Sequence, residues 1–147
     1  VNDYPKFFKM DPLCRLGFIA TELLLKAEGE TAERARNDRA VVVCTRHGCY
    51  ANDCRYQQTI TDENYFPSPA VFVYTLANIV TGEIAIRHHY QGETSCFVLQ
   101  EYEAERVRQL AATAFCDHET KSVVCAWLDC RNEGEFEAVV ELMERNV

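Results

Sequence analysis

The longest apolar stretch lies in the middle of the chain, from Tyr65 to Gly92, and predicts two consecutive buried helices. Ser68 is suited to cap the first of them, and Pro69 fits the first helical position, where its missing N–H is not needed. From Ala70 to Val80 the polar side-chain atoms are confined to Tyr74, Thr75 and Asn78. A helix that is apolar on almost every side must be enclosed by protein, so we expect this helix at the centre of the fold.

Helical spacing also marks segments on either side of this stretch. Residues Asn2 to Asp11 mix aromatic residues with lysines and predict an ordered lead-in. Asp11 and Pro12 are typical of a helix start, and apolar residues then recur at helical spacing as far as Gly29. The same spacing predicts a helix over 101–115, whereas the polar residues 49–64 have no clear period and are compatible with a short helix. The charged residues 30–39 predict a solvated connection.

Three short, largely apolar runs predict buried strands: Ala40–Thr45, Thr94–Leu99 and Ser122–Asp129. The first of them is a continuous β-branched run, which is typical of a strand buried on both faces. A fourth segment, Phe136 to Met143, follows an Asn-Glu-Gly turn at 132–134 and alternates between apolar and other residues. Its spacing also fits a helix, but strict alternation favours a strand with one wetter face, and we predict the strand.

Helices alternate with buried strands along most of the chain, which predicts an α/β fold with a mostly parallel sheet covered on both faces. The 147 residues are enough for one domain with a substantial core, and we expect a single domain over 1–147.

Composition narrows the classes of partner. A net charge of −8 and a pI near 5.0 argue against nucleic acids and anionic membranes, which both need a face rich in lysine and arginine. Several of the eight cysteines sit inside apolar runs, among them Cys44, Cys96 and Cys125, and we interpret them as reduced thiols of a cytoplasmic protein. We expect no membrane span, which needs roughly 20 apolar residues, and no signal peptide.

A set of spaced motifs resembles the N-terminal half of β-ketoacyl-acyl-carrier-protein synthases of the thiolase superfamily. The pattern comprises Ser68-Pro69, Phe72, Leu76-x-Asn78-x-x-x-Gly82-Glu-x-Ala85-Ile86 and Gly92. Upstream, Lys6-Phe-Phe-Lys-Met10-Asp11 resembles the matching segment of the small ketosynthase-like proteins of aryl-polyene and flexirubin-type pigment clusters. The resemblance implies half of a thiolase-like fold.

The resemblance also implies where a nucleophile would stand. In the family a reactive cysteine begins a helix that follows a strand, about nine positions after a glycine, and the helix N-terminus favours the thiolate. Here that glycine corresponds to Gly92, and the nucleophile position is filled by Gln100 or Glu101. Neither is a nucleophile for acyl transfer, and chain-length factors are similar in having glutamine there. Cys96 is the less favoured alternative, because a cysteine inside a strand is expected to pack rather than react.

We assign no catalytic role to His47, His88, His89 or His118, because the histidines of the family come from a C-terminal half that this sequence does not match. His88 and His89 are interpreted as cations that complement the end of a helix beside Arg87. The spacing of Cys44, Cys49 and Cys54 around His47 is not typical of a metal site, so we expect no metal and no cofactor. The aspartates do not form a recognisable pair in sequence: Asp3, Asp11, Asp62 and Asp129.

Three hypotheses for function follow. The first is a non-catalytic, chain-length-factor-like partner or scaffold in fatty-acyl or polyene biosynthesis. It would form a homodimer, or a heterodimer with a full-length ketosynthase, through a dimer strand made of Thr94, Ser95, Cys96, Phe97, Val98 and Leu99. The second is an active acyltransferase or 3-oxoacyl-carrier-protein synthase component completed by a partner chain. The third is a docking module for acyl carrier protein, which requires a cluster among Arg34, Arg36, Arg39 and Arg87.

Overall fold

The structure is a computed structural model and describes residues 3–30, 35–63 and 66–145. Among the residues named above, Asn2, Arg34, Asn64 and Tyr65 lie outside these ranges. Four strands form one sheet in the order β2-β1-β3-β4: β1 (Arg39–Thr45), β2 (Thr94–Val98), β3 (Ser122–Asn132) and β4 (Glu135–Glu144). The first three strands in this order are parallel, and β4 is antiparallel to β3. The predicted mostly parallel sheet is therefore confirmed.

The central strands are buried because both of their faces are apolar. Every residue of β1 is buried, as are the first seven of β3. Alternate residues point to opposite faces, so Val41 and Val43 join one hydrophobic core while Val42 and Cys44 join the other. The strands predicted at Ala40–Thr45 and Ser122–Asp129 are thus confirmed, with β3 running three residues further than expected.

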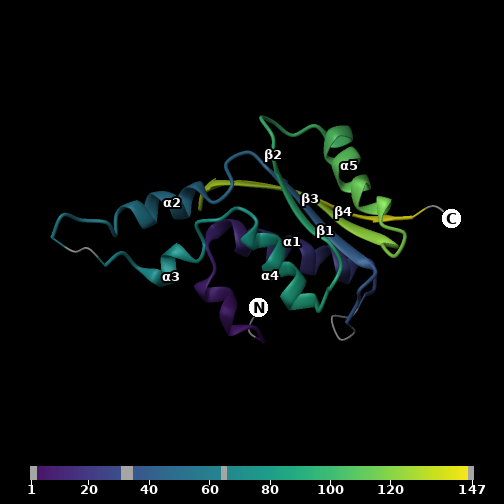
Figure 1. Cartoon of the computed structure of the whole chain (residues 1–147), viewed down its shortest axis with the longest axis horizontal. Coiled ribbons are helices and arrows are strands. Elements are labelled where there is room, and N and C mark those ends of the chain that lie inside the picture. The colour runs from purple at the N-terminus through teal and green to yellow at the C-terminus, as the bar shows by residue number, and fades with distance from the viewer. Residues whose placement is uncertain (1–2, 31–34, 64–65, 146–147) are drawn as a thin grey trace.

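Helices cover both faces of this sheet (Figure 1). On one face lie α1 (Pro12–Ala27) and α4 (Ile79–His88), and on the other lie α5 (Ala104–Ala112) and the short 3-10 helix η2 (Thr113–Cys116). Asp11 caps α1 as predicted, since its carboxylate accepts hydrogen bonds from the backbone N–H groups of Leu13 and Cys14. The lead-in before α1 forms a second 3-10 helix, η1 (Pro5–Lys9).

The long buried helix predicted over Ala70–Val80 is wrong. Only a single turn, α3 (Pro69–Phe72), forms there, none of its residues is buried, and Ser68 makes no side-chain cap. The hydroxyl of Thr75 donates to the carbonyl oxygen of Phe72, a local bond that competes with those of a continuous helix. Of the predicted pair, α4 alone is a helix that packs into the core, through Val80 and Ile84.

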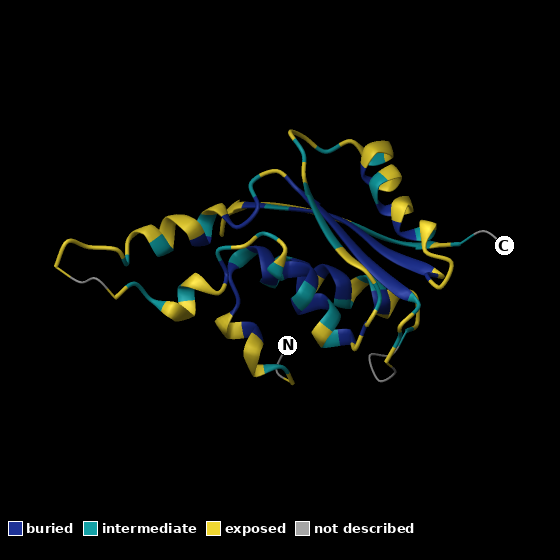
Figure 2. Ribbon diagram, in the orientation of Figure 1, coloured by how far each residue is buried: buried dark blue, intermediate teal, exposed yellow. Residues whose placement is uncertain are grey.

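α2 (Tyr50–Gln57) and α3 form an arm, defined here as residues 50–63 and 66–72, that projects from the sheet and its covering helices (Figure 1). Most of its ribbon is exposed in Figure 2. The apolar side chains at its base are also exposed, with exposed fractions of 57% for Phe72, 52% for Val73 and 61% for Leu76. Exposed apolar groups gathered in this way are typical of interaction surfaces.

The strand predicted at Thr94–Leu99 exists as β2 but is not buried as expected. It lies at the edge of the sheet, hydrogen-bonded to β1 alone, with Thr94 and Val98 exposed. β4, at the opposite edge, confirms the strand predicted for 136–143, and its first half is exposed on both faces. The predicted turn is stabilised by the hydrogen bond from the Gly134 N–H to Asn132 Oδ1, 2.9 Å.

The connection predicted to be solvated over 30–39 contains one of the most buried cations of the protein. Arg39 has an exposed fraction of 1%. Its guanidinium donates to Ser122 Oγ at 2.8 Å, to Glu30 Oε1 at 2.7 Å and to Tyr90 Oη at 3.2 Å. These partners satisfy a charge that would be costly to bury alone, and they fix the position of the start of β1.

None of the helices in the described part of the chain is both long and apolar enough to span a bilayer.

Candidate functional site

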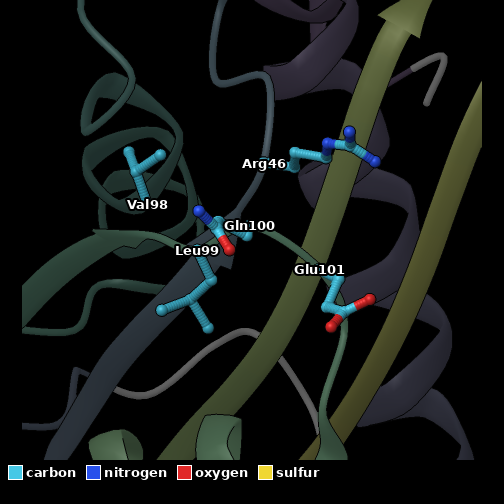
Figure 3. Close-up of a pocket in the computed structure, with 5 residues that line it drawn as sticks. All are labelled: Arg46, Val98, Leu99, Gln100 and Glu101. Carbon is cyan, nitrogen blue, oxygen red and sulfur yellow. The ribbon is translucent and has the colours of Figure 1, made fainter.

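Gln100 and Glu101, which the resemblance assigns to the nucleophile position, lie just after the carboxyl end of β2. A cavity of about 580 Å³ opens there, lined by Arg46, Val98, Leu99, Gln100 and Glu101 (Figure 3). In this view Val98 and Glu101 lie on opposite sides of Gln100, and Arg46 approaches from the end of β1. In sheets with parallel strands, ligands bind outside the carboxyl ends of the strands, so this is where the fold places a site.

The backbone sets the direction of these side chains. The N–H of Leu99 donates to the carbonyl of Thr45 at 2.9 Å and continues the ladder one residue beyond β2. Leu99 packs into the core beneath α5, and the chain then bends so that Gln100 and Glu101 are exposed. The lining therefore offers a guanidinium, an amide and a carboxylate, and none of these three groups is a nucleophile for acyl transfer.

The helix after this site begins later than predicted. We expected helix from Glu101 to Phe115, but α5 starts at Ala104, and its N-cap residue Glu103 makes no side-chain cap. Glu101 therefore stands three positions before the first helical residue, too far to benefit strongly from the helix dipole, whose effect falls off within the first turn. The carboxylate of Glu101 is therefore not placed at the N-terminus of α5.

Cys96 lies in the middle of β2, paired in register with Val43. Burial raises the pKa of its thiol, which disfavours the thiolate that nucleophilic attack requires. The thiols of Cys44 and Cys125 lie deeper in the sheet, and burial raises their pKa to about 11 and about 12. All eight cysteines are free thiols in the structure.

His47 and Asp129 form a pair that the sequence did not predict. His47 Nδ1 lies 2.7 Å from Asp129 Oδ2 at the carboxyl ends of β1 and β3. Asp129 Oδ1 also accepts from the N–H of Arg46 and of His47, at 3.0 and 2.8 Å. Burial alone would raise the pKa of Asp129, but these hydrogen bonds lower it below its usual value, so the carboxylate is charged. The pair holds the loop that carries Arg46 to the cavity.

The four histidines do not gather at one site. His47 follows β1 at the carboxyl end of the parallel strands, whereas His88 and His89 precede β2 and His118 precedes β3, at the amino end. The described residues 3–30, 35–63 and 66–145 contain no group of three or more His, Cys, Asp or Glu side chains that could hold a metal ion. Of the set considered above, Cys44 is buried inside β1 and Cys54 is exposed on α2.

His88 is a buried, neutral ring rather than a cation at a helix end, which corrects our interpretation. Burial lowers its pKa, with the charge of Glu22 acting in the opposite direction. The Nε2 atom lies 3.7 Å from Glu22 Oε1, and neither ring nitrogen has a hydrogen-bond partner. His89 ends α4 in the left-handed conformation, with φ of 56°, and its backbone N–H bonds the preceding turn.

This burial makes stability depend on pH. The imidazole of His88 is protonated near pH 6.5 in the unfolded state but only at a lower pH in the folded state. The free energy of unfolding therefore falls as the pH drops below about 6.5. His88→Leu is expected to remove this dependence and to stabilise the protein by about 1 kcal/mol, because two unpaired buried nitrogens are lost. Urea unfolding at pH 5.5 and 7.5 measures both effects; an unchanged pH dependence in the variant would contradict the assignment.

Of the arginines considered for carrier docking, the three that the structure describes are each paired with an acidic side chain. Arg39 is bound by Glu30, Arg36 Nε lies 2.9 Å from Asp38 Oδ1, and Arg87 Nε lies 2.6 Å from Glu22 Oε1.

Comparison with known proteins identifies the fold. No protein-family model matches the chain, and the search of curated proteins found no match. Among solved structures, the chain is similar to the ishigamide ketosynthase/chain length factor, with a TM-score of 0.68 and 20% sequence identity. The match covers 82% of this chain and 34% of that chain, so the sequence spans about a third of its neighbour's length. The protein thus has a ketosynthase-like fold of the thiolase type, corresponding to half of a thiolase-like fold.

Proposed function

We propose that this chain is a non-catalytic partner or scaffold of a ketosynthase, acting in the manner of a chain-length factor in fatty-acyl or polyene biosynthesis. The observation that carries the proposal is the cavity at the end of β2. Where a ketosynthase needs a thiolate at a helix N-terminus, this chain has Gln100 and Glu101 on a bend ahead of α5. The neighbour that shares the fold is itself a ketosynthase/chain length factor, which supports this choice of pathway and partner.

The free edge of β2 supports assembly. Among the strands of the described residues, Thr94–Val98 pairs with β1 alone, so the backbone donors and acceptors of its other edge face no strand there. Natural proteins rarely leave such an edge open, because it is a template for another strand. We propose that Thr94–Leu99 pairs with its own copy or with the matching strand of a full-length ketosynthase across a two-fold axis.

The proposal is tested by mass measurement in solution, alone and after co-expression with a full-length ketosynthase. We expect a dimer of the chain or a one-to-one complex, in either case with Phe97 and Val98 protected from solvent. Hydrogen exchange of the β2 amides checks the contact directly. A stable monomer in both preparations, with the β2 amides exchanging freely, would contradict the proposal.

A second measurement separates a partner from an enzyme. Incubation with acyl-CoA or acyl carrier protein, followed by intact-mass spectrometry, is expected to show no acyl adduct on this chain, because no described thiol stands at a helix N-terminus in the cavity. Cys96→Ser is the matched control. An adduct that disappears in Cys96→Ser would establish the acyltransferase alternative instead.

A further inference from the structure

A groove separates the N-terminal segment from the arm. Its larger lobe, of about 570 Å³, lies between η1 with the start of α1 on one side and α2 with α3 on the other. A smaller lobe of about 210 Å³ continues it toward the turn between β3 and β4. The two lobes share Met10, Arg15, Asn52 and Arg55, so they form one elongated groove. It shares no lining residue with the cavity at the end of β2.

The larger lobe is mostly apolar. Phe8, Met10, Ala70, Val71 and Val73 contribute to its wall, and Phe8 and Val73 have exposed fractions of 63% and 52%. Its volume falls in the range of about 300–1,000 Å³ that is usual for small-molecule sites. An apolar chain laid along this lobe would cover side chains that are now in contact with water.

The groove is lined by cations with unused hydrogen-bond donors: Arg15 and Arg55 where the lobes meet, and Lys9 in the larger lobe. In the described ranges neither Lys9 nor Arg55 has a hydrogen bond or ion pair through its side chain, and Arg15 Nε is buried without a partner. One nitrogen of Arg15 donates to the carbonyl of Phe8 at 3.0 Å, which holds its guanidinium at the groove. Lys6, also in the wall, is already paired with Glu83 at 2.8 Å.

The acidic groups of the groove do not cancel these charges. Asp11 is buried and its carboxylate accepts the N–H groups of Leu13 and Cys14. Among the described residues, Glu133 is the one acidic residue that lines the smaller lobe, against the two cations Arg15 and Arg55. An anionic group between Arg15 and Arg55 would gain charge-assisted hydrogen bonds, which are the strong ones.

We propose that this groove binds a single-chain amphiphile with an anionic head, a carboxylate or a phosphate ester. The head lies between Arg15 and Arg55, and the alkyl chain lies along the larger lobe on Phe8, Val71 and Val73. A small amphiphile fits better than an acidic protein, because the chain as a whole carries a net charge of −8 and repels a large anion at long range. The proposal is independent of assembly through β2.

The test is a calorimetric titration of the intact chain with decanoate, decyl phosphate and decanol. We expect both anions to bind and decanol to bind about tenfold or more weakly, since it lacks the charge that the guanidinium groups bind. Comparison of the two anions identifies the preferred head group. Arg55→Gln is expected to weaken anion binding about tenfold, and because Arg55 is exposed on α2 its replacement leaves the fold intact.

Arg46→Gln, at the other cavity, is the matched control and is expected to leave the affinity unchanged. Val71→Asp, in the apolar wall, is expected to weaken both anions, and circular dichroism verifies its fold. The proposal is overturned if neither anion binds, if decanol binds equally well, or if Arg55→Gln has no effect. Binding of an acidic carrier protein at this groove without binding of either amphiphile would also overturn it.

Discussion

Replacing Val98 by proline is expected to weaken assembly of the chain while leaving its fold intact. The N–H of Leu99 donates to the carbonyl of Thr45, and the carbonyl of Glu93 accepts from the N–H of Val41. The odd-numbered residues from 93 to 99 therefore direct their backbone groups to β1. Thr94, Cys96 and Val98 therefore direct their backbone groups to the open edge. Proline at 98 removes one outward donor without touching the ladder to β1, and edge strands tolerate proline in that orientation.

The expected change in the dissociation constant of the dimer follows from the hydrogen bonds that Val98→Pro removes. Each contributes about 0.5–1.5 kcal/mol, and a two-fold dimer loses two of them, so the dissociation constant is expected to rise about tenfold or more. Sedimentation equilibrium across a concentration series measures it. Val98→Thr is the matched control, because it keeps the N–H and a β-branched side chain at an exposed position. If Val98→Pro assembles as tightly as Val98→Thr, then β2 is not the contact.

The sequence predicted which segments form strands, but it did not predict which strand lies at an edge of the sheet. The runs at Ala40–Thr45 and Ser122–Asp129 were correctly predicted as central strands, because each has neighbours on both sides. The run at Thr94–Leu99 is also largely apolar but forms a strand at an edge of the sheet. The composition of a run predicts that its side chains will be buried. It does not predict whether the strands and helices that bury them belong to the same chain.

The same limit explains the error over Ala70–Val80. Its apolar residues predicted a helix enclosed by protein, yet Phe72, Val73 and Leu76 are exposed at the base of the arm. The match to a third of a longer ketosynthase-like chain offers a reason: apolar residues of such a fold are suited to contact elements outside this half. An apolar pattern therefore predicts burial, either within the chain or in a contact with another protein segment.

The candidate site was predicted from the resemblance to β-ketoacyl synthases rather than from the pattern of apolar and polar residues. The count from Gly92 placed Gln100 and Glu101 at the end of β2, and the structure puts both in the cavity there. The pair of His47 and Asp129 was missed because 82 positions separate the two residues. One feature of the sequence could have indicated it: both residues follow or end strands predicted to be parallel, and the carboxyl ends of such strands meet at one edge.

Gly92→Ala is expected to be the most destabilising single substitution discussed for this protein. A Cβ atom at Gly92 would lie 2.3 Å from the carbonyl oxygen of Arg39 and 2.8 Å from its carbonyl carbon. The backbone of Arg39 cannot move away easily, because its side chain is bound by Glu30, Tyr90 and Ser122. Overpacking against a fixed backbone is expected to cost about 3 kcal/mol.

Gly82→Ala is the matched control, since the same chemical change has the opposite expected sign there. Gly82 lies inside α4, and an added Cβ would meet nothing within 4 Å. Alanine is favoured over glycine in a helix by about 1 kcal/mol, so this variant is expected to gain stability. Urea unfolding compares both variants with the wild type. If Gly92→Ala unfolds at the wild-type midpoint, the close approach of Gly92 to the backbone of Arg39 is not rigid. That contact would then not fix the position of β2, the strand proposed to pair with a partner.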